Sequence, residues 1–146
     1  MEDVRESQGR GERAAMKGRP DPGTGSFSLA SRARSFQHAG RGVAVLLSGQ
    51  PNTWIHAAAT VAVVALGLYL EVSSLDWCAL ILAITAVWVA ECLNTAIEVL
   101  ADAISSDWDP LIGRAKDIAA GGVLIAAIGA VAIGLVVLGP PLLRLF

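Results

Sequence analysis

Three long runs of apolar residues dominate the last two thirds of the chain. Each is close to the ~20 residues that a helix needs to cross a hydrocarbon layer ~30 Å thick. They predict membrane-spanning helices over residues 54–70, 77–101 and 118–138. The third run has no charged residue, which is not the pattern of a helix at the surface of a soluble bundle. We therefore expect an all-α membrane protein.

A different pattern precedes the first run. Residues 1–26 are rich in Gly, Pro, Ser, Arg and Glu, so they predict a disordered arm that buries little apolar surface. Over 27–47, apolar residues recur at roughly helical spacing with arginines between them, which is typical of an amphipathic helix lying in a membrane interface. The Gly, Pro and Asn of 48–53 predict a turn. Residues 27–146 are thus expected to form one membrane domain.

The basic residues predict the orientation of these helices. Eight of the 11 Lys and Arg residues precede the first span, whereas the connection between the first two spans has none. Arg114 and Lys116 lie between the second and third spans. By the positive-inside rule, the amino terminus and the second connection should be cytoplasmic, in a multi-pass protein of the cytoplasmic (inner) membrane. A basic arm on an otherwise acidic chain gives no reason to expect a nucleic-acid partner.

The two cysteines, Cys78 and Cys92, lie inside apolar segments without CxxC spacing. Neither a disulfide framework nor a zinc site is indicated, and we expect both to be small buried apolar side chains.

The segment VAECLNTAIEVLAD at the end of the second span interrupts the apolar pattern with polar residues. On a helix that advances 100° per residue, Glu91, Asn94, Glu98 and Asp102 fall on one narrow face. Glu91 lies roughly 10 Å deeper than Glu98 along this helix. A carboxylate at such depth costs about 2.5–3.5 kcal/mol, so its presence requires a partner, a cation or a reaction.

The polar face offers the parts of a phosphoryl-transfer site. Glu91 is placed to act as a general base, and Glu98, nearer the surface, to bind Mg²⁺, which takes one or two carboxylates together with phosphate and water oxygens. Lys116 adds positive charge for phosphates just before the expected start of the third span, where unpaired backbone N–H groups also favour anions. These parts predict ATP as the phosphate donor. The sequence has no GxxxxGK[ST] motif, so a P-loop is excluded.

Two other interpretations fit parts of the pattern. Glu91, Asn94 and Glu98 could only hold helices together by hydrogen bonds, as polar residues do in non-enzymatic membrane bundles. Glu91 alone could also serve proton-coupled transport, although this leaves Glu98 and Lys116 without a role. Small residues recur every four positions on the third span, which favours close helix packing and self-association. They are Gly122, Ala126, Ala130 and Gly134.

The segments ECLNTAIEVLAD and GRAKDIAAGGVLIAAIGAVAIG resemble the small prokaryotic integral-membrane diacylglycerol kinase family, which includes undecaprenol kinases. The resemblance runs from about Ser35 to the end of the third span, and SFQHAGRG is similar to the family's surface helix. It implies a surface helix and three transmembrane helices in a homotrimer whose active sites are shared between subunits at the cytoplasmic interface. It also implies a lipid kinase that uses ATP and Mg²⁺.

Matching positions carry the family's site residues onto this chain. Glu91 corresponds to the proposed catalytic base and Glu98 to a magnesium ligand. The positions associated with ATP and the catalytic centre are Asn94, Asp102, Asp107, Lys116 and Asp117. Independently of the resemblance, His56 lies near a membrane interface, where it is expected either to snorkel or be hydrogen-bonded or, with Trp54, to contact the lipid headgroup.

Two positions depart from the family pattern. Gln50 stands where many members have a second metal-binding Glu; its amide oxygen can ligate magnesium but adds no charge. Asp109 stands where a His is common, which bears on nucleotide contacts. The expected acceptor is the primary hydroxyl of a membrane lipid alcohol, and both diacylglycerol and undecaprenol fit this description.

Overall fold

A computed structural model describes residues 29–49, 51–105, 107 and 109–145. This part of the chain forms four helices, α2 (Leu29–Gly49), α3 (Pro51–Tyr69), α4 (Ser74–Ile104) and α5 (Pro110–Leu143), and no strand. The all-α prediction is confirmed. The arm predicted over 1–26 and Gln50 both lie outside the described residues.

Three of these helices are long and apolar enough to cross a membrane, namely Asn52–Tyr69, Ser74–Ile104 and Pro110–Leu143. The prediction of three candidate spans is therefore confirmed. At 1.5 Å per residue, α3 is roughly 28 Å long, whereas α4 and α5 reach roughly 46 and 51 Å. Since a hydrocarbon layer is ~30 Å thick, α4 and α5 are longer than is needed to cross it.

The turn predicted over 48–53 is wrong for most of its length. Ser48 and Gly49 belong to α2, while Pro51 to Thr53 form the first turn of α3. Proline is favoured at the first position of a helix because its missing N–H would have no partner there and its φ angle is already helical. Thr53 is therefore a helical residue, which determines where its side chain points.

The start of α5 also differs from the prediction. Asp109 caps this helix, accepting hydrogen bonds from the backbone N–H groups of Leu111 (2.7 Å) and Ile112 (3.3 Å). The helix therefore begins at Pro110, eight positions before the predicted 118. Lys116 lies inside α5 rather than ahead of it, so the expectation that it stands beside free backbone N–H groups is wrong.

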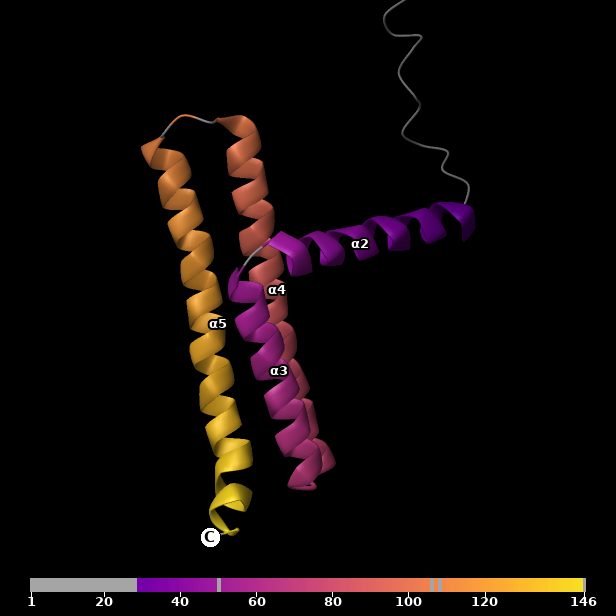
Figure 1. The fold of residues 1–146 in the computed structure, drawn as a ribbon, viewed down its shortest axis with the longest axis vertical. Helices are drawn as coiled ribbons and strands as arrows, with labels where there is room; N and C mark the ends of the chain where they lie inside the picture. The colour runs from indigo at the N-terminus through magenta and orange to yellow at the C-terminus, as the bar shows by residue number, and fades with distance from the viewer. Residues whose placement is uncertain (1–28, 50, 106, 108, 146) are drawn as a thin grey trace, which may run out of the picture. The chain divides into compact units, whose positions relative to one another are not determined.

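The helix packing described next lies within the compact unit Gly40–Phe146. In this unit α4 and α5 run antiparallel, side by side, and α3 contacts both of them (Figure 1). Most of the core side chains come from α4, namely Leu80, Ala83, Val87 and Ala101, and Leu138 is the buried residue of α5. Both α3 and α5 keep much of their apolar surface exposed, as expected for helices that face lipid or other copies of the chain.

A short turn joins α3 to α4. Ser73 and Asp76 form a capping box, in which each side chain accepts a hydrogen bond from the other residue's backbone N–H, both at 3.2 Å. In the last turn of α3, Gly67 lets the Trp77 indole approach closely: a Cβ at this position would lie 3.0 Å from the ring. This close contact fixes α3 against the start of α4.

The prediction that both cysteines are buried is wrong. Cys78 and Cys92 are free thiols and exposed on α4.

Candidate functional site

The polar face of α4 changes in burial along its length. Glu91 is 2% exposed and Asn94 8%. Glu98 is half-buried, and the side chain of Asp102 is 75% exposed. The sequence predicted this stripe, and the structure adds that it runs from a buried carboxylate to a solvent-accessible one.

Glu91 contacts the first two turns of α3. The Thr53 hydroxyl donates a hydrogen bond to Glu91 Oε1 at 3.3 Å, and His56 Nε2 lies 3.9 Å from Glu91 Oε2. The buried carboxylate thus lies at the level where α3 begins. Sequence reasoning missed Thr53, because the predicted turn over 48–53 gave this residue no defined direction.

Asn94 and Thr95 lie one turn after Glu91. Asn94 Nδ2 donates to Glu98 Oε1 at 3.0 Å, an i,i+4 contact on α4. Asn94 Oδ1 and Thr95 Oγ1 are buried and have no hydrogen-bond partner within the described part of the chain. A buried polar atom without a partner costs about 1–3 kcal/mol, so such atoms call for an explanation. Two of them beside Glu91 favour a binding site over a role in helix packing alone.

Lys116 joins the end of α4 to α5. Its Nζ lies 3.0 Å from Asp102 Oδ1, with side chains that are 39% and 75% exposed. An ion pair this exposed contributes little to stability, at most about 1 kcal/mol. The predicted meeting of these two segments is confirmed, although Lys116 comes from within a helix.

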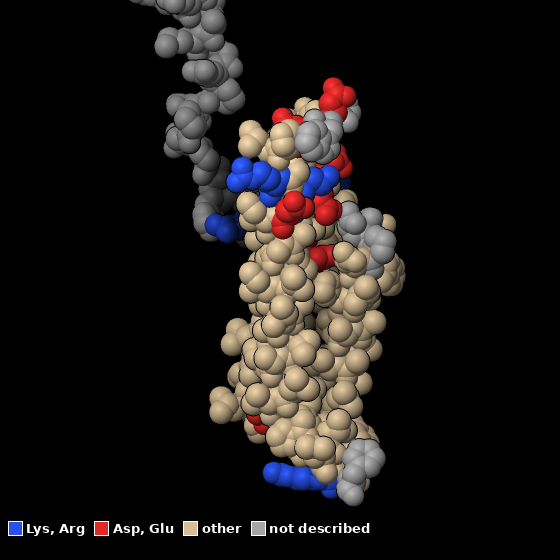
Figure 2. Space-filling view, turned by 90° about the vertical axis from the view of Figure 1, so that its left-hand side faces the viewer, with Lys and Arg blue, Asp and Glu red and all other residues tan. Residues whose placement is uncertain are grey.

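The other predicted acidic residues are close in sequence but differ in their contacts. Asp107 is exposed in the α4–α5 connection, where its N–H donates to Ser105 Oγ at 3.1 Å. Asp117 is exposed on α5. The carboxylate of Asp109 caps α5, which gives this departure from the family pattern a local structural role. Figure 2 shows charged side chains gathered near this end and a largely uncharged middle.

The residues around Glu98 fit a magnesium ion that is held largely by substrate and water. In the described ranges no group of three or more His, Cys, Asp or Glu side chains is arranged to hold a metal. Mg²⁺ needs no such group, because it keeps several waters and binds one or two carboxylates together with phosphate oxygens. The Glu98 carboxylate is an oxygen ligand of this kind, and so is Asn94 Oδ1, which has no hydrogen-bond partner within the ranges that the structure describes. Gln50, the second predicted metal ligand, lies outside the described residues.

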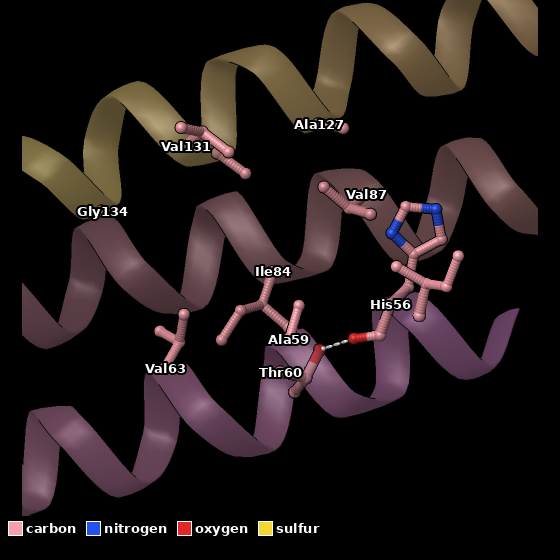
Figure 3. Close-up of a pocket in the computed structure, with 11 residues that line it drawn as sticks. His56, Ala59, Thr60, Val63, Ile84, Val87, Ala127, Val131 and Gly134 are labelled. Carbon is pink, nitrogen blue, oxygen red and sulfur yellow. Dashed lines mark hydrogen bonds between the residues drawn. The ribbon is translucent and has the colours of Figure 1, made fainter. Parts of the chain in front are cut away.

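An apolar cavity of about 300 Å³ lies between α3, α4 and α5, with His56 in its wall (Figure 3). Its lining includes Ile84 and Val87 of α4 and Val131 of α5. Thr60 is also in the wall, but its hydroxyl donates to the His56 carbonyl at 2.8 Å and accepts from Trp88 Nε1 at 3.1 Å.

Trp54 lies elsewhere on α3. It is 66% exposed and lines an open groove with Val61 and four alanines. The structure therefore separates the two residues predicted to contact lipid: His56 lies against Glu91, whereas Trp54 faces outward.

Three helices of membrane length, with a buried glutamate and an exposed Lys–Asp pair near one end, define an integral-membrane protein with a charged site at the edge of its apolar region. Residues 37–138 match the family model described as prokaryotic diacylglycerol kinase. The chain belongs to this family, which confirms the resemblance, and the matched range includes every predicted site residue.

Individual relatives carry two different names. A protein of Bacillus subtilis (strain 168) named undecaprenol kinase is 40% identical over 109 residues, which is 75% of this chain and 89% of that protein. A diacylglycerol kinase of Synechocystis sp. is 39% identical over 112 residues, 76% of this chain and 64% of that protein. The Escherichia coli (strain K12) diacylglycerol kinase is 37% identical over 90 residues, 57% of this chain and 74% of that protein.

Proposed function

We propose that this protein is a lipid kinase that transfers the γ-phosphate of ATP to the primary hydroxyl of a membrane lipid alcohol, with Mg²⁺ as cofactor. The observation that carries the proposal is the gradient along α4, from the buried Glu91 to the exposed Asp102–Lys116 pair. Such a gradient allows an apolar alcohol and a water-soluble nucleotide to meet on one helix face. Membership of the prokaryotic diacylglycerol kinase family supports the same activity.

Each residue has a role that follows from its place on this gradient. Glu91, the most buried carboxylate in the described part of the chain, takes the proton of the lipid hydroxyl as the oxygen attacks the γ-phosphorus and ADP leaves. Glu98, whose Oε1 accepts from Asn94 Nδ2 at 3.0 Å, would hold Mg²⁺, and the ion would neutralise phosphate charge. Lys116 binds the phosphates of ATP. Asp102 holds the Lys116 ammonium in place at 3.0 Å.

The nucleotide lies on the exposed side of the site. Asp107 and Asp117, both exposed near the α4–α5 connection, are the remaining contacts that we assign to ATP. The lysine and arginine distribution supports a cytoplasmic location for this end and for the amino terminus, in a protein of the inner membrane. ATP then enters from the cytoplasm.

The lipid approaches from the bilayer. His56, which lies against Glu91, contacts the headgroup near the reacting hydroxyl, and Trp54, outward on α3, contacts lipid at the interface. The amphipathic α2 helix lies on the membrane surface. The exposed apolar faces of α3 and α5 are available for contacts between copies in a homotrimer.

The structure also bears on the competing interpretation, a bundle whose polar residues only hold helices together. The Thr53–Glu91 hydrogen bond is of that kind. Polar groups kept only for packing within one copy should be paired, however, and Asn94 Oδ1 and Thr95 Oγ1 have no hydrogen-bond partner among the described residues. Proton-coupled transport stays a prediction, which proton-flux measurements in vesicles would test.

A phosphate-transfer assay tests the kinase proposal. The purified protein is incubated in detergent with γ-labelled ATP and either diacylglycerol or undecaprenol, with Mg²⁺ or with a chelator. We expect label in at least one lipid, dependent on Mg²⁺, and the lipid that is labelled identifies the acceptor. If a folded protein transfers label to neither alcohol at saturating Mg²⁺, the proposal is wrong.

A further inference from the structure

Thr53 is among the most completely buried side chains in the described part of the chain. It is 1% exposed, and Leu80 is the other large side chain below 2%. A buried hydroxyl without a hydrogen bond lowers stability, and that of Thr53 has one, which it donates to Glu91 Oε1 at 3.3 Å. A threonine on α3 is thereby attached directly to the carboxylate proposed as the catalytic base.

The two oxygens of Glu91 have different surroundings. Oε1 accepts the hydrogen bond from Thr53, whereas Oε2 faces His56 Nε2 at 3.9 Å, beyond hydrogen-bond distance. Threonine is branched at Cβ, so its χ1 angle has few accessible values in a helix, and the hydrogen bond to Oε1 selects one of them. One oxygen of the carboxylate is therefore fixed and the other is left available.

We propose that Thr53 is a positioning residue for the general base: it fixes the Glu91 carboxylate through Oε1 and leaves Oε2 to receive the proton of the lipid alcohol. The inference rests on the proposed kinase function. In the reaction, the hydroxyl proton moves to Oε2, the lipid oxygen bonds to the γ-phosphorus, and the bond from that phosphorus to the ADP oxygen breaks. Thr53 gives up no proton and touches no substrate.

A positioning role differs from a purely structural one in what its loss changes. Without the Thr53 hydroxyl, the carboxylate can rotate, so fewer encounters are productive although both substrates still bind. A displacement of about 1 Å at a reacting group can cost up to ~100-fold in rate. The free energy of one hydrogen bond to a charged group corresponds to a change in rate of roughly 10-fold or more. We therefore expect the loss in kcat and not in KM.

The test compares Thr53→Val, which removes the hydroxyl but keeps the branched shape, with Thr53→Ser, which keeps the hydroxyl. Thr53→Val should lower kcat by about 10-fold, with KM for ATP and for lipid changed less than about twofold. Thr53→Ser should retain most of the turnover. Thr60→Val is the matched control, because Thr60 lies on the same helix roughly 10 Å away and bonds to His56 O and Trp88 rather than to Glu91. Its kcat should stay near that of the unchanged protein.

Several outcomes overturn the proposal. It is wrong if Thr53→Val keeps full kcat, if KM rises while kcat is unchanged, or if Thr53→Ser loses as much turnover as Thr53→Val.

An infrared measurement separates this inference from the kinase proposal, because it does not depend on turnover. The difference spectrum between proteins with and without Glu91→Gln isolates the Glu91 carboxyl band. If that band shifts on Thr53→Val, the contact holds even should the unchanged protein label no lipid. If the band does not move, Thr53 does not position Glu91, whatever the kinase assay gives.

Discussion

The two ends of α4 use polar residues in opposite ways. At its start, Ser73 and Asp76 form a closed set of hydrogen bonds within a single turn. Toward its other end, Glu91 bonds to another helix, and Asn94 keeps a buried oxygen without a partner among the described residues. The polar groups at the start of α4 thus bond to each other, whereas those toward its other end include a buried acceptor that no described residue pairs with.

This difference separates polar residues that build the fold from those available for chemistry. A capping box satisfies backbone groups that would otherwise lack partners, so it stabilises the helix. Buried oxygens without a hydrogen-bond partner lower stability and call for an explanation, such as a catalytic role or a water or ion that pairs with them. Changes at the Glu91 end should therefore alter turnover more than stability, and changes at the Ser73 end should do the reverse.

The largest effect is expected for Glu91→Gln. The amide keeps the shape of the side chain and can still accept from Thr53, but it cannot take up a proton. General-base catalysis contributes about 10²–10⁴-fold, so kcat should fall by at least ~100-fold. ATP affinity, measured by equilibrium binding of a labelled analogue, should change little. A parallel loss of nucleotide affinity would show that Glu91 belongs to the ATP site instead.

A smaller effect is expected for Lys116→Ala, at the exposed edge of the same end. Loss of one ammonium facing phosphates should raise the KM for ATP by roughly 10-fold, since a charge-assisted contact is removed. Stability should be nearly unchanged, because the pair with Asp102 is exposed. Arg114→Ala, two positions away on α5, is the matched control for lost charge. An equal rise in KM for both variants would mean that only net charge matters.

Much of this fold could be predicted from the sequence, because hydrophobic run length and helical periodicity are strong signals. Helix ends were predicted less well. The start of α5 was misplaced because its second turn carries the charged residues Arg114, Lys116 and Asp117, and a span defined by an uninterrupted apolar run starts only after them. A capping residue such as Asp109 sets the start of a helix through local hydrogen bonds, and the length of an apolar run does not predict where these form.

The site was predicted in part for the same physical reason. Glu91, Asn94, Glu98 and Asp102 lie on one helix, so their shared face follows from 100° per residue. Thr53 lies 38 positions before Glu91, and only the packing of α3 on α4 brings them together. Contacts between helices depend on the rotation of each helix about its axis, which a single sequence leaves open.

Gly67→Ala tests the packing at the opposite end of α4. The new methyl group would lie 3.0 Å from the Trp77 ring, tighter than ordinary contact. Overpacking of this kind costs about 1–3 kcal/mol, and the higher helix propensity of alanine offsets up to about 1 kcal/mol of it. Gly129→Ala on α5 gains the same propensity and meets nothing within 4 Å, so the difference between the two variants isolates the contact. In denaturant titrations in mixed micelles, Gly67→Ala should unfold first, with turnover below the midpoint unchanged.

The smallest effect is expected for Ser73→Ala, which opens the capping box. The Asp76 N–H loses its acceptor, and Asp76 loses the Ser73 hydroxyl that donates to it at 2.7 Å. Loss of a cap costs about 1 kcal/mol, and here the released groups are exposed and can turn to water, which limits the loss. Ser73→Thr keeps the hydroxyl and should restore stability, while Ser74→Ala, one position on, should change it less.

Measuring the turnover of Ser73→Ala tests whether the two ends of α4 act independently. Ser73 lies roughly 27 Å from Glu91 along α4, so opening the cap should leave kcat and both KM values within error. A lowered kcat at temperatures where the protein stays folded would show that the two ends are coupled through α4. The division between residues that build the fold and residues free for chemistry would then fail, because a purely local cap would be setting the position of a distant carboxylate.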